Sequence, residues 1–291
     1  MRKIFLPERL EKKLTDPFHS VDKHNEELYQ FLSENPDEGG RPTLDDIKFV
    51  RTTDKYGRNV FRRTLADYIT KEKPDFPFKT WTEEQVTNKF HKLKTYDWTK
   101  WISTRDKKDV LEKYDDYKYS YSKYGLGVID APPSYNSISD SFMNPLRLAC
   151  GSYGFKSPVQ RWNEGDNIWG AFGPIWRGIN DTCDLNAITY LGAFRLGTYI
   201  ATQFKPTVAK TIYQMTDAKT VLDTSMGWGD RLTGFYASDA THYIGCDPNP
   251  NTFAKYKEMI KFYDDLTGGK KTTQIYNCGA EDLPWDEIND V

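Results

Sequence analysis

The stretch VLDTSMGWGDRL (221–232) decides the expected fold. Its first residues complete a short apolar strand that begins near residue 219, and Gly227 and Gly229 then provide a tight turn. The residues after Gly229 predict a helix. Backbone N–H groups at the start of such a helix, together with the positive end of its dipole, favour a phosphate or a carboxylate.

Two further strands are predicted downstream of this turn. THYIGCDPNPN (241–251) predicts a strand that ends at Asp247, and the next residues, to 266, predict an amphipathic helix. KTTQIYNCGAEDLP (271–284) predicts a third strand that runs into a loop. The order β-α-β-α-β is typical of a parallel sheet with helices on its faces. We therefore expect an α/β fold with a partial Rossmann-like sheet of three consecutive parallel strands, at 219–223, 242–247 and 273–278.

Acidic residues stand at the ends of the first two predicted strands. Asp223 precedes the glycine turn, where its carboxylate would repel a pyrophosphate and attract an ammonium group. Asp247 is placed to accept hydrogen bonds from both hydroxyls of a ribose. The third glycine of the dinucleotide-binding GxGxxG pattern is absent. This combination suits S-adenosyl-L-methionine better than NAD, so a nucleotide-binding oxidoreductase is the less favoured enzyme.

These motifs resemble those of a known family. VLDTSMGWGDRL resembles the first motif of class I S-adenosylmethionine-dependent methyltransferases, and IGCDPNPNTF (244–253) and IYNCGAEDLP (275–284) resemble the second and third. TQFKPTVAK (202–210) is similar to the helix that precedes the first motif and lines the methionine end of the cofactor. Within the class, the chain looks like the DNA amino-methyltransferases of N6-adenine or N4-cytosine type, especially viral and phage versions. The resemblance covers about residues 195–291.

The resemblance implies S-adenosyl-L-methionine as the cofactor and DNA, or less favoured RNA, as the partner. Asp223 and Ser225 would lie with the two turn glycines around the methionine part, Asp247 would take the ribose and Pro248 the adenine. Many relatives hold the adenine amino group with an acid after the third strand, where this chain has Gly279; the backbone of Ala280 or the carboxylate of Glu281 would serve instead. The complete predicted cofactor-binding set is Phe204, Lys205, Pro206, Asp223, Ser225, Met226, Gly227, Trp228, Gly229, Asp247, Pro248, Ala280 and Glu281.

The family's catalytic motif, an Asn, Asp or Ser followed by two prolines and an aromatic residue, has no counterpart after the third strand. Two alternatives are open: truncation before a fourth strand, which we favour, or a permuted order with VIDAPPSYN (128–136) as the catalytic segment. There Asp130 and Tyr135 imitate the motif imperfectly, because Ala131 and Ser134 break its spacing. No catalytic residue is therefore predicted, and we expect this chain alone to transfer methyl groups poorly.

Composition divides the chain near residue 130. Residues 1–130 are dense in charges of both signs and are expected to form a mainly helical accessory or target-recognition region. Residues 131–291 have fewer charges and more glycine, and are expected to form the methyltransferase domain, incomplete at its C-terminal end. Within them, the tryptophan-rich segment that begins near residue 149 predicts a loop structure held by packed aromatic rings. Trp162, Trp169 and Trp176 are its tryptophans.

Charge and cysteine spacing exclude several classes. The formal net charge of −2 excludes nucleic-acid binding through bulk positive charge. No run of about 18 apolar residues predicts a transmembrane helix, and the charged N-terminus does not resemble a secretory signal. The cysteines are widely spaced without a CxxC pair, so reduced thiols are expected rather than a zinc site or a disulfide framework. They are Cys150, Cys183, Cys246 and Cys278.

We therefore expect a cytoplasmic protein, in the host cytoplasm if the source is viral, with neither a metal nor a membrane partner. The alternative function is a catalytically inactive methyltransferase-like module that binds nucleic acid or a protein partner. The oligomeric state is left open.

Overall fold

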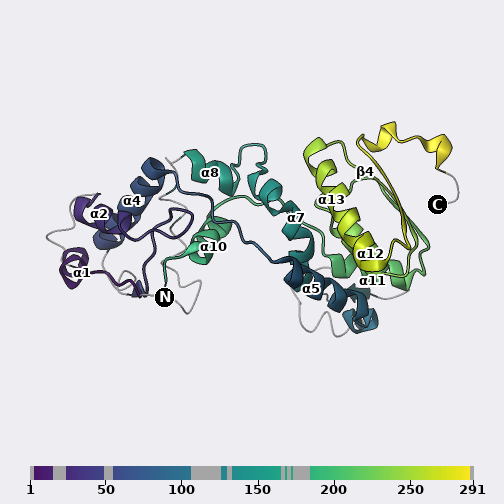
Figure 1. Ribbon diagram of the computed structural model, residues 1–291, viewed down its shortest axis with the longest axis horizontal. Helices are drawn as coiled ribbons and strands as arrows, with labels where there is room; N and C mark the ends of the chain where they lie inside the picture. Colours follow the sequence, from purple (N-terminus) through teal and green to yellow (C-terminus); the bar gives the residue numbers. More distant parts are fainter. Residues whose placement is uncertain are drawn as a thin grey trace. The chain divides into compact units, whose positions relative to one another are not determined.

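The computed structural model describes residues 3–15, 24–48, 55–105, 126–129, 133–164, 168, 172 and 184–288. The chain divides into two compact units (Figure 1). Unit 1 comprises Met1–Lys79 and Arg147–Ala201, and unit 2 comprises Thr80–Leu146 and Thr202–Val291. Together they form a mixed α/β protein.

Unit 1 is mainly helical in its described residues. Its helices are α1 (Glu8–Thr15), α2 (Glu26–Ser33), α4 (Lys55–Glu72), α8 (Pro158–Glu164) and α10 (Ala187–Gly197). Their buried apolar side chains form one core, to which both chain segments of the unit contribute. Trp162 is buried in that core and donates its indole N–H to the Pro74 carbonyl, so its predicted packing role is confirmed. The predicted loop structure is wrong at this position, because Trp162 lies in helix α8. Trp169 and Trp176 lie outside the described residues.

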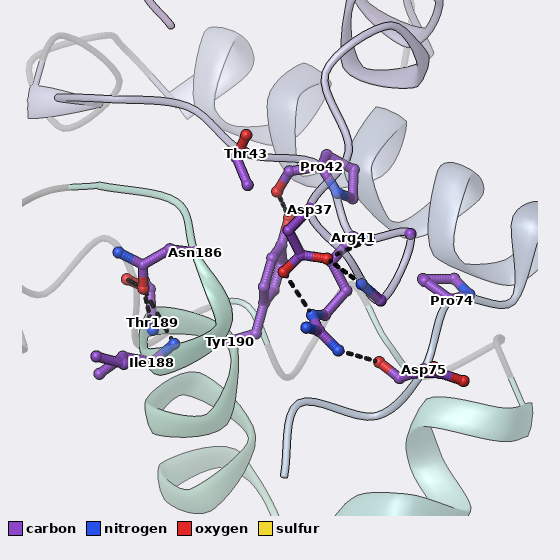
Figure 2. Close-up of polar contacts among 12 residues, drawn as sticks. Asp37, Arg41, Pro42, Thr43, Pro74, Asp75, Asn186, Ile188, Thr189 and Tyr190 are labelled. Carbon is purple, nitrogen blue, oxygen red and sulfur yellow. Dashed lines mark hydrogen bonds and ion pairs between the residues drawn. The ribbon is translucent and has the colours of Figure 1, made fainter. Parts of the chain in front are cut away.

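A closed polar cluster holds the turn between α2 and α4 (Figure 2). The Asp37 carboxylate accepts the backbone N–H groups of Gly39 and Arg41 on Oδ1 and the Nε–H of Arg41 on Oδ2, the last at 2.9 Å. Arg41 Nη1 donates to the Asp75 carbonyl at 3.0 Å. The Tyr190 hydroxyl donates to the Pro42 carbonyl at 2.7 Å, so α10 is fixed to the same turn.

Unit 2 contains a parallel sheet of three strands in the order β3-β4-β5. The strands are β3 (Thr220–Asp223), β4 (His242–Cys246) and β5 (Thr272–Tyr276), and they lie within a residue or two of their predicted bounds. The register pairs Asp223 with Gly245 and Cys246 with Tyr276. Helices α12 (Asp230–Ala237) and α13 (Pro250–Thr267) connect the strands, so the predicted β-α-β-α-β order is confirmed.

The segment proposed as a permuted catalytic motif does not join this sheet through its described residues. β2 (Leu126–Ile129) pairs antiparallel with β1 (Ile102–Arg105), whereas permutation required it to pair in parallel with β3. Among the described residues, β3 pairs with β4 alone, as we expected for an unpermuted order. Asp130 and Ala131 lie outside the described residues, and Tyr135 ends the short helix η2 (Pro133–Tyr135).

The other described elements of unit 2 come before or after the three strands in the sequence. They are α5 (Glu83–Thr95), the short helix η1 (Trp98–Trp101), α7 (Asn136–Ala149, whose last residues belong to unit 1), α11 (Pro206–Met215), and the short helices η4 (Ala280–Asp282) and η5 (Trp285–Glu287).

Composition suggested a boundary at residue 130, but the two units do not divide there. Helix α5 explains the difference. A capping box of Thr82 and Gln85 begins the helix. Its apolar residues Val86, Phe90 and Leu93 recur at helical spacing and are buried in the core of unit 2. The charged side chains of α5, which made the composition of residues 1–130 look uniform, lie on the side of the helix opposite this apolar stripe. The apolar stripe decides where α5 packs, and it packs with the C-terminal sheet.

Two lysines, the buried Lys210 and the half-buried Lys271, fix the C-terminal ends of helices in unit 2. Each Nζ donates to three carbonyls that lie in the last turn of a helix or just beyond it. The acceptors are Leu93, Lys94 and Tyr96 for Lys210, and Phe235, Ser238 and Ala240 for Lys271, at 2.6–2.9 Å. Burial lowers the pKa of both lysines to about 8. These contacts tie α11 to the end of α5, and the start of β5 to the end of α12.

Candidate functional site

The turn after β3 needs glycine at two positions. Gly227 and Gly229 have φ angles of 58° and 75°, in the left-handed region that side chains disfavour. A Cβ on Gly229 would also lie 2.8 Å from Sδ of Met259. The Met226 N–H donates to the Cys246 carbonyl at 3.0 Å, which fixes the turn to the end of β4. The predicted glycine turn is therefore present, directly before the first residue of α12.

A cavity of about 320 Å³ adjoins this turn at the carboxyl end of β3. Open α/β sheets characteristically bind ligands outside the carboxyl ends of their strands. The lining residues are Thr202, Gln203, Phe204, Ser225, Met226, Gly227, Trp228, Asp230 and Arg231. Phe204, Ser225, Met226, Gly227 and Trp228 belong to the set predicted from sequence.

The cavity joins two segments that are distant in sequence. The indole N–H of Trp228 donates to the Thr202 carbonyl at 3.0 Å, and the Gln203 amide donates to Oδ1 of Asp230 at 3.1 Å. These bonds hold the 202–204 segment, which leads into α11, beside the glycine turn. The predicted association of TQFKPTVAK with the first motif is therefore seen in the structure.

Asp223 lies behind the cavity rather than in its lining. Its side chain is buried, Oδ1 accepts the Ser225 N–H at 3.1 Å, and Oδ2 accepts the Tyr243 hydroxyl at 2.6 Å and the Arg231 Nε–H at 2.8 Å. Burial and the adjacent carboxylate raise the pKa of Tyr243 well above its ordinary value, so its hydroxyl remains a donor. The charge of Asp223 is thus balanced by Arg231.

Asp247 lies beneath the glycine turn. Its Oδ2 accepts the Gly227 N–H at 3.0 Å and the Tyr256 hydroxyl at 3.1 Å. Its Oδ1 accepts the Asn249 N–H at 3.0 Å and the Thr252 hydroxyl at 3.2 Å. Each of these hydroxyls has a single hydrogen and a closer second acceptor: the Gly227 carbonyl at 2.5 Å for Tyr256, and the Asn249 carbonyl at 3.0 Å for Thr252. The two backbone N–H groups are therefore the committed donors to Asp247, and they connect it to the glycine turn and to the start of α13.

The remaining predicted residues lie near the cavity's elements but outside its lining. Lys205 is the N-cap of α11 and Pro206 is its first residue, where a proline needs no N–H partner. Pro248 is exposed after β4, and Ala280 and Glu281 lie in η4 after β5. The positions assigned to the adenine are therefore at the same sheet edge but not in this cavity.

Sequence reasoning missed four of the lining residues, Thr202, Gln203, Asp230 and Arg231. Asp230 and Arg231 stand inside the quoted motif, at the first two positions of α12. The signal that could have identified them is an acidic residue followed by a basic one at the start of a helix, directly after the glycine turn of the predicted cofactor site. Nothing local to the motif indicated that Arg231 would pair with Asp223.

Other kinds of site receive no support from the described residues. No helix among them is long and apolar enough to cross a lipid bilayer. They contain no group of three or more His, Cys, Asp or Glu side chains placed to hold a metal ion. The described cysteines Cys150, Cys246 and Cys278 are free thiols, while Cys183 lies outside the described part of the chain. Burial raises the pKa of Cys246 to about 11, so this thiol is a poor nucleophile at neutral pH.

Comparison with family models, curated proteins and solved structures finds no match for this chain. Its function is therefore inferred from the residues of the site.

Proposed function

We propose that unit 2 binds S-adenosyl-L-methionine and that the protein transfers the methyl group to a base amine in DNA. The observation that carries the proposal is the cavity of about 320 Å³ beside the glycine turn of β3. Its volume is near the lower end of the range for small-molecule sites, about 300–1,000 Å³. The turn, the adjoining 202–204 segment and the parallel order β3-β4-β5 are the features that the resemblance to class I methyltransferases implied.

The lining suits a ligand with both apolar and charged parts. Phe204 and Trp228 offer aromatic surface, Ser225 offers a hydroxyl, and Asp230 and Arg231 offer opposite charges. The bound cofactor would supply an electrophilic methyl group. The amine nitrogen would form the new bond to carbon as the carbon–sulfur bond breaks, the sulfonium would become a neutral thioether, and the amine proton would pass to water. The protein's task is mainly to align the amine with that methyl group.

A surface turn in unit 1 supports a nucleic acid as the partner. The backbones of Ser152 and Phe155 pair through two hydrogen bonds of 2.9 Å, and Gly154 adopts a φ of 76° between them. Tyr153 is fully exposed at the tip, with a relative accessibility of 101%. The Phe155 ring stacks on Tyr199, with 6.3 Å between centroids. A rigid turn thus presents aromatic rings to solvent.

The charge of this segment suits the same partner. The sequence has no acidic residue between Asp140 and Glu164, whereas it has Arg147, Lys156 and Arg161. Of these, Lys156 is paired with the Glu164 carboxylate and Arg147 donates to the Ala201 carbonyl. Exposed aromatic rings beside basic side chains stack on unpaired bases and contact phosphates. An amino-methyltransferase needs an unstacked base, because its target atom is not accessible within a duplex.

Calorimetry with the 291-residue chain tests cofactor binding. We expect S-adenosyl-L-methionine and S-adenosyl-L-homocysteine to bind and NAD not to bind. A folded chain that binds neither S-adenosyl compound would contradict the proposal, and binding of NAD alone would favour an oxidoreductase.

Single-turnover labelling with tritiated cofactor, at protein excess over DNA, tests transfer. Oligo(dT) is the matched control because thymine has no exocyclic amine. Label in mixed-sequence DNA but not in oligo(dT) is expected for a base-amine methyltransferase. Cofactor binding without label in DNA or RNA would favour the inactive-module alternative. Replacing the exposed Tyr153 by Ala should weaken binding to single-stranded DNA by about fivefold or more, since stacking contributes about 1–3 kcal/mol per base.

A further inference from the structure

A groove of about 540 Å³ lies between α13 and β5 in unit 2. Its lining shares no residue with the cavity beside the glycine turn. Phe253 and Ile260 of α13 and Ile275 of β5 give the groove apolar surface. These three side chains pack against the core of unit 2 but are only partly buried. The groove is therefore an apolar surface beside the outer strand of the sheet.

The outer edge of β5 has backbone groups that point away from the sheet. The Thr272 N–H and the Tyr276 carbonyl both bond to residues that flank β4. Successive residues of a strand direct their backbone groups to opposite sides, so Thr273 and Ile275 direct their N–H and carbonyl groups away from β4. Among the described strands, β5 pairs with β4 alone. This edge can accept a further strand.

The sequence of β5 does not protect its edge. Edge strands in natural proteins commonly carry a lysine, a proline or a bulge that prevents pairing with another chain. The strand TTQIY (272–276) contains neither a charged residue nor a proline, and Gln274 at its centre is exposed. The composition of β5 therefore favours pairing of this edge with a further strand.

Two exposed charges of opposite sign line the groove. Lys261 and Asp265 stand one turn apart on α13. The ion pair that α13 forms among the described residues joins Lys255 to Glu258 instead. Helix α13 connects the parallel strands β4 and β5, so it runs antiparallel to both. A basic and an acidic side chain thus follow each other along the groove, parallel to the edge of β5.

We propose that the β5 edge and this groove form an interface between two copies of the chain, related by a twofold axis near Gln274. The two β5 strands pair antiparallel, and Thr273 exchanges its backbone bonds with Ile275 of the partner subunit. The twofold axis also reverses the direction of the second α13. Lys261 then faces the partner's Asp265, and Asp265 faces the partner's Lys261.

A second copy suits the surface better than a strand from a different protein. A twofold interface requires a surface that is complementary to itself, and one positive and one negative charge along an antiparallel helix pair meet this requirement. A partner of uniform charge would leave either Lys261 or Asp265 opposite a like charge. The inference goes beyond the proposed function and does not depend on it, because the cavity for the cofactor lies elsewhere in unit 2.

Sedimentation equilibrium of the 291-residue chain tests the association. We expect a reversible monomer–dimer equilibrium between about 5 and 200 µM, the affinity of an interface smaller than the standard of about 1,600 Å². A chain that remains monomeric over this range would overturn the inference.

Charge reversal tests the pairing of the two helices. Lys261→Glu places acidic side chains opposite the partner's Asp265, and Asp265→Lys places basic ones opposite the partner's Lys261. Each variant alone should dimerise about tenfold more weakly or worse, because like charges then face each other at both ends of the groove. An equal mixture of the two variants should recover dimers, since the acidic side chains of one copy then face the basic side chains of the other.

A substitution on the axis tests the strand pairing independently. Gln274→Lys brings two ammonium groups directly opposite each other across the strands and should also weaken the dimer by about tenfold. Lys219→Glu is the matched control, because it reverses an exposed charge just before β3, at the other edge of the sheet, and should leave the equilibrium unchanged.

Circular dichroism confirms that each variant is folded before its association is measured. A dimer that persists in both Lys261→Glu and Gln274→Lys would lie on another surface and would overturn the inference. A mixture of Lys261→Glu and Asp265→Lys that stays monomeric would overturn it as well, because the two variants restore every charge pair that the proposed interface contains.

Discussion

The two units each contain an aspartate–arginine pair beside a glycine turn, and the pairs are used differently. In unit 1 the Nε–H of Arg41 donates to Oδ2 of Asp37 at 2.9 Å; in unit 2 the Nε–H of Arg231 donates to Oδ2 of Asp223 at 2.8 Å. In both, Oδ1 of the carboxylate accepts a backbone N–H of the following turn. The local chemistry is nearly the same.

The difference lies in the outer nitrogens of the guanidinium. Arg41 donates from Nη1 to the Asp75 carbonyl, and its side chain is only 13% exposed, which closes the cluster in Figure 2. Arg231 directs no such bond to a described residue, and its side chain faces a cavity instead. An aspartate–arginine pair near a turn is therefore structural or available for binding according to the direction of its remaining N–H groups.

The largest effect is expected from the turn that presents Arg231. Gly229→Ala adds a Cβ at positive φ against Met259 and should lower the free energy of unfolding by about 2–5 kcal/mol, the sum of backbone strain and overpacking. Gly268 has the same φ of 75° and no atom within 4 Å of the added Cβ, so Gly268→Ala is the matched control, expected to cost about 1–2 kcal/mol. Urea denaturation measures both. Equal losses would indicate that Met259 moves aside freely.

The same substitution in the two arginines compares the pairs directly. Arg41→Gln and Arg231→Gln should each lower the free energy of unfolding by about 2–4 kcal/mol, because each leaves a mostly buried carboxylate without its cation and with two remaining donors. Calorimetry on the same proteins should show a loss of ligand affinity for Arg231→Gln alone. If Arg41→Gln weakened the ligand as much as Arg231→Gln did, the contrast between the pairs would be wrong.

Removing the second donor to Asp223 should have a somewhat smaller effect. Tyr243→Phe deletes a buried hydroxyl that donates to the carboxylate at 2.6 Å, and a loss of about 1.5–3 kcal/mol is expected for such a bond. Thermal or urea unfolding checks this value. Tyr276→Phe, on the neighbouring strand β5, is the control and should change stability by less than about 0.5 kcal/mol. A neutral Tyr243→Phe would mean that water replaces the hydroxyl.

The smallest expected effect is the pH dependence that the buried Lys210 gives to the free energy of unfolding. The pKa of Lys210 is about 8 in the folded protein and about 10.4 in an unfolded chain. Between these values the unfolded chain binds more protons, so this lysine makes the free energy of unfolding rise with pH. The stability difference between the wild-type protein and Lys210→Met should therefore shift in favour of the wild type from pH 8 to 9.5. The opposite contribution of Cys246 is common to both proteins and cancels.

The exposed Lys257→Met is the matched control, and its stability should follow that of the wild type at a constant offset. Parallel curves for Lys210→Met and the wild type would contradict the prediction.

The strands of unit 2 were predictable from sequence because their signals are local. An apolar run that ends in Asp223 and a glycine turn, repeated as a run ending in Asp247, determines strand bounds and parallel order within a few residues. The glycines were predictable for the same reason, since positive φ is required at Gly227 and Gly229. Short-range periodicity and turn chemistry carry this part of the fold.

The partners of the carboxylates were not predictable in this way. Asp223 is paired with Arg231 and Tyr243, which are 8 and 20 residues away in sequence and on different elements. Which donors reach a buried acid depends on how α12 and β4 pack, and a motif does not contain that information. The division into units differs from the composition boundary at residue 130 for a related reason, because the packing of α5 follows its apolar stripe and not its charge.

The bonds of Asp247 also determine which wall of the cavity can move. This side chain ties the floor of the cavity, at Gly227, to α13 through Tyr256, so the floor and the long helix move as one body. The opposite wall, at 202–204, is joined to the turn by the bonds of Trp228 and Gln203. A ligand that entered past the 202–204 segment would have to break those two bonds, so the rate of release of the proposed cofactor, more than its affinity, would report on them.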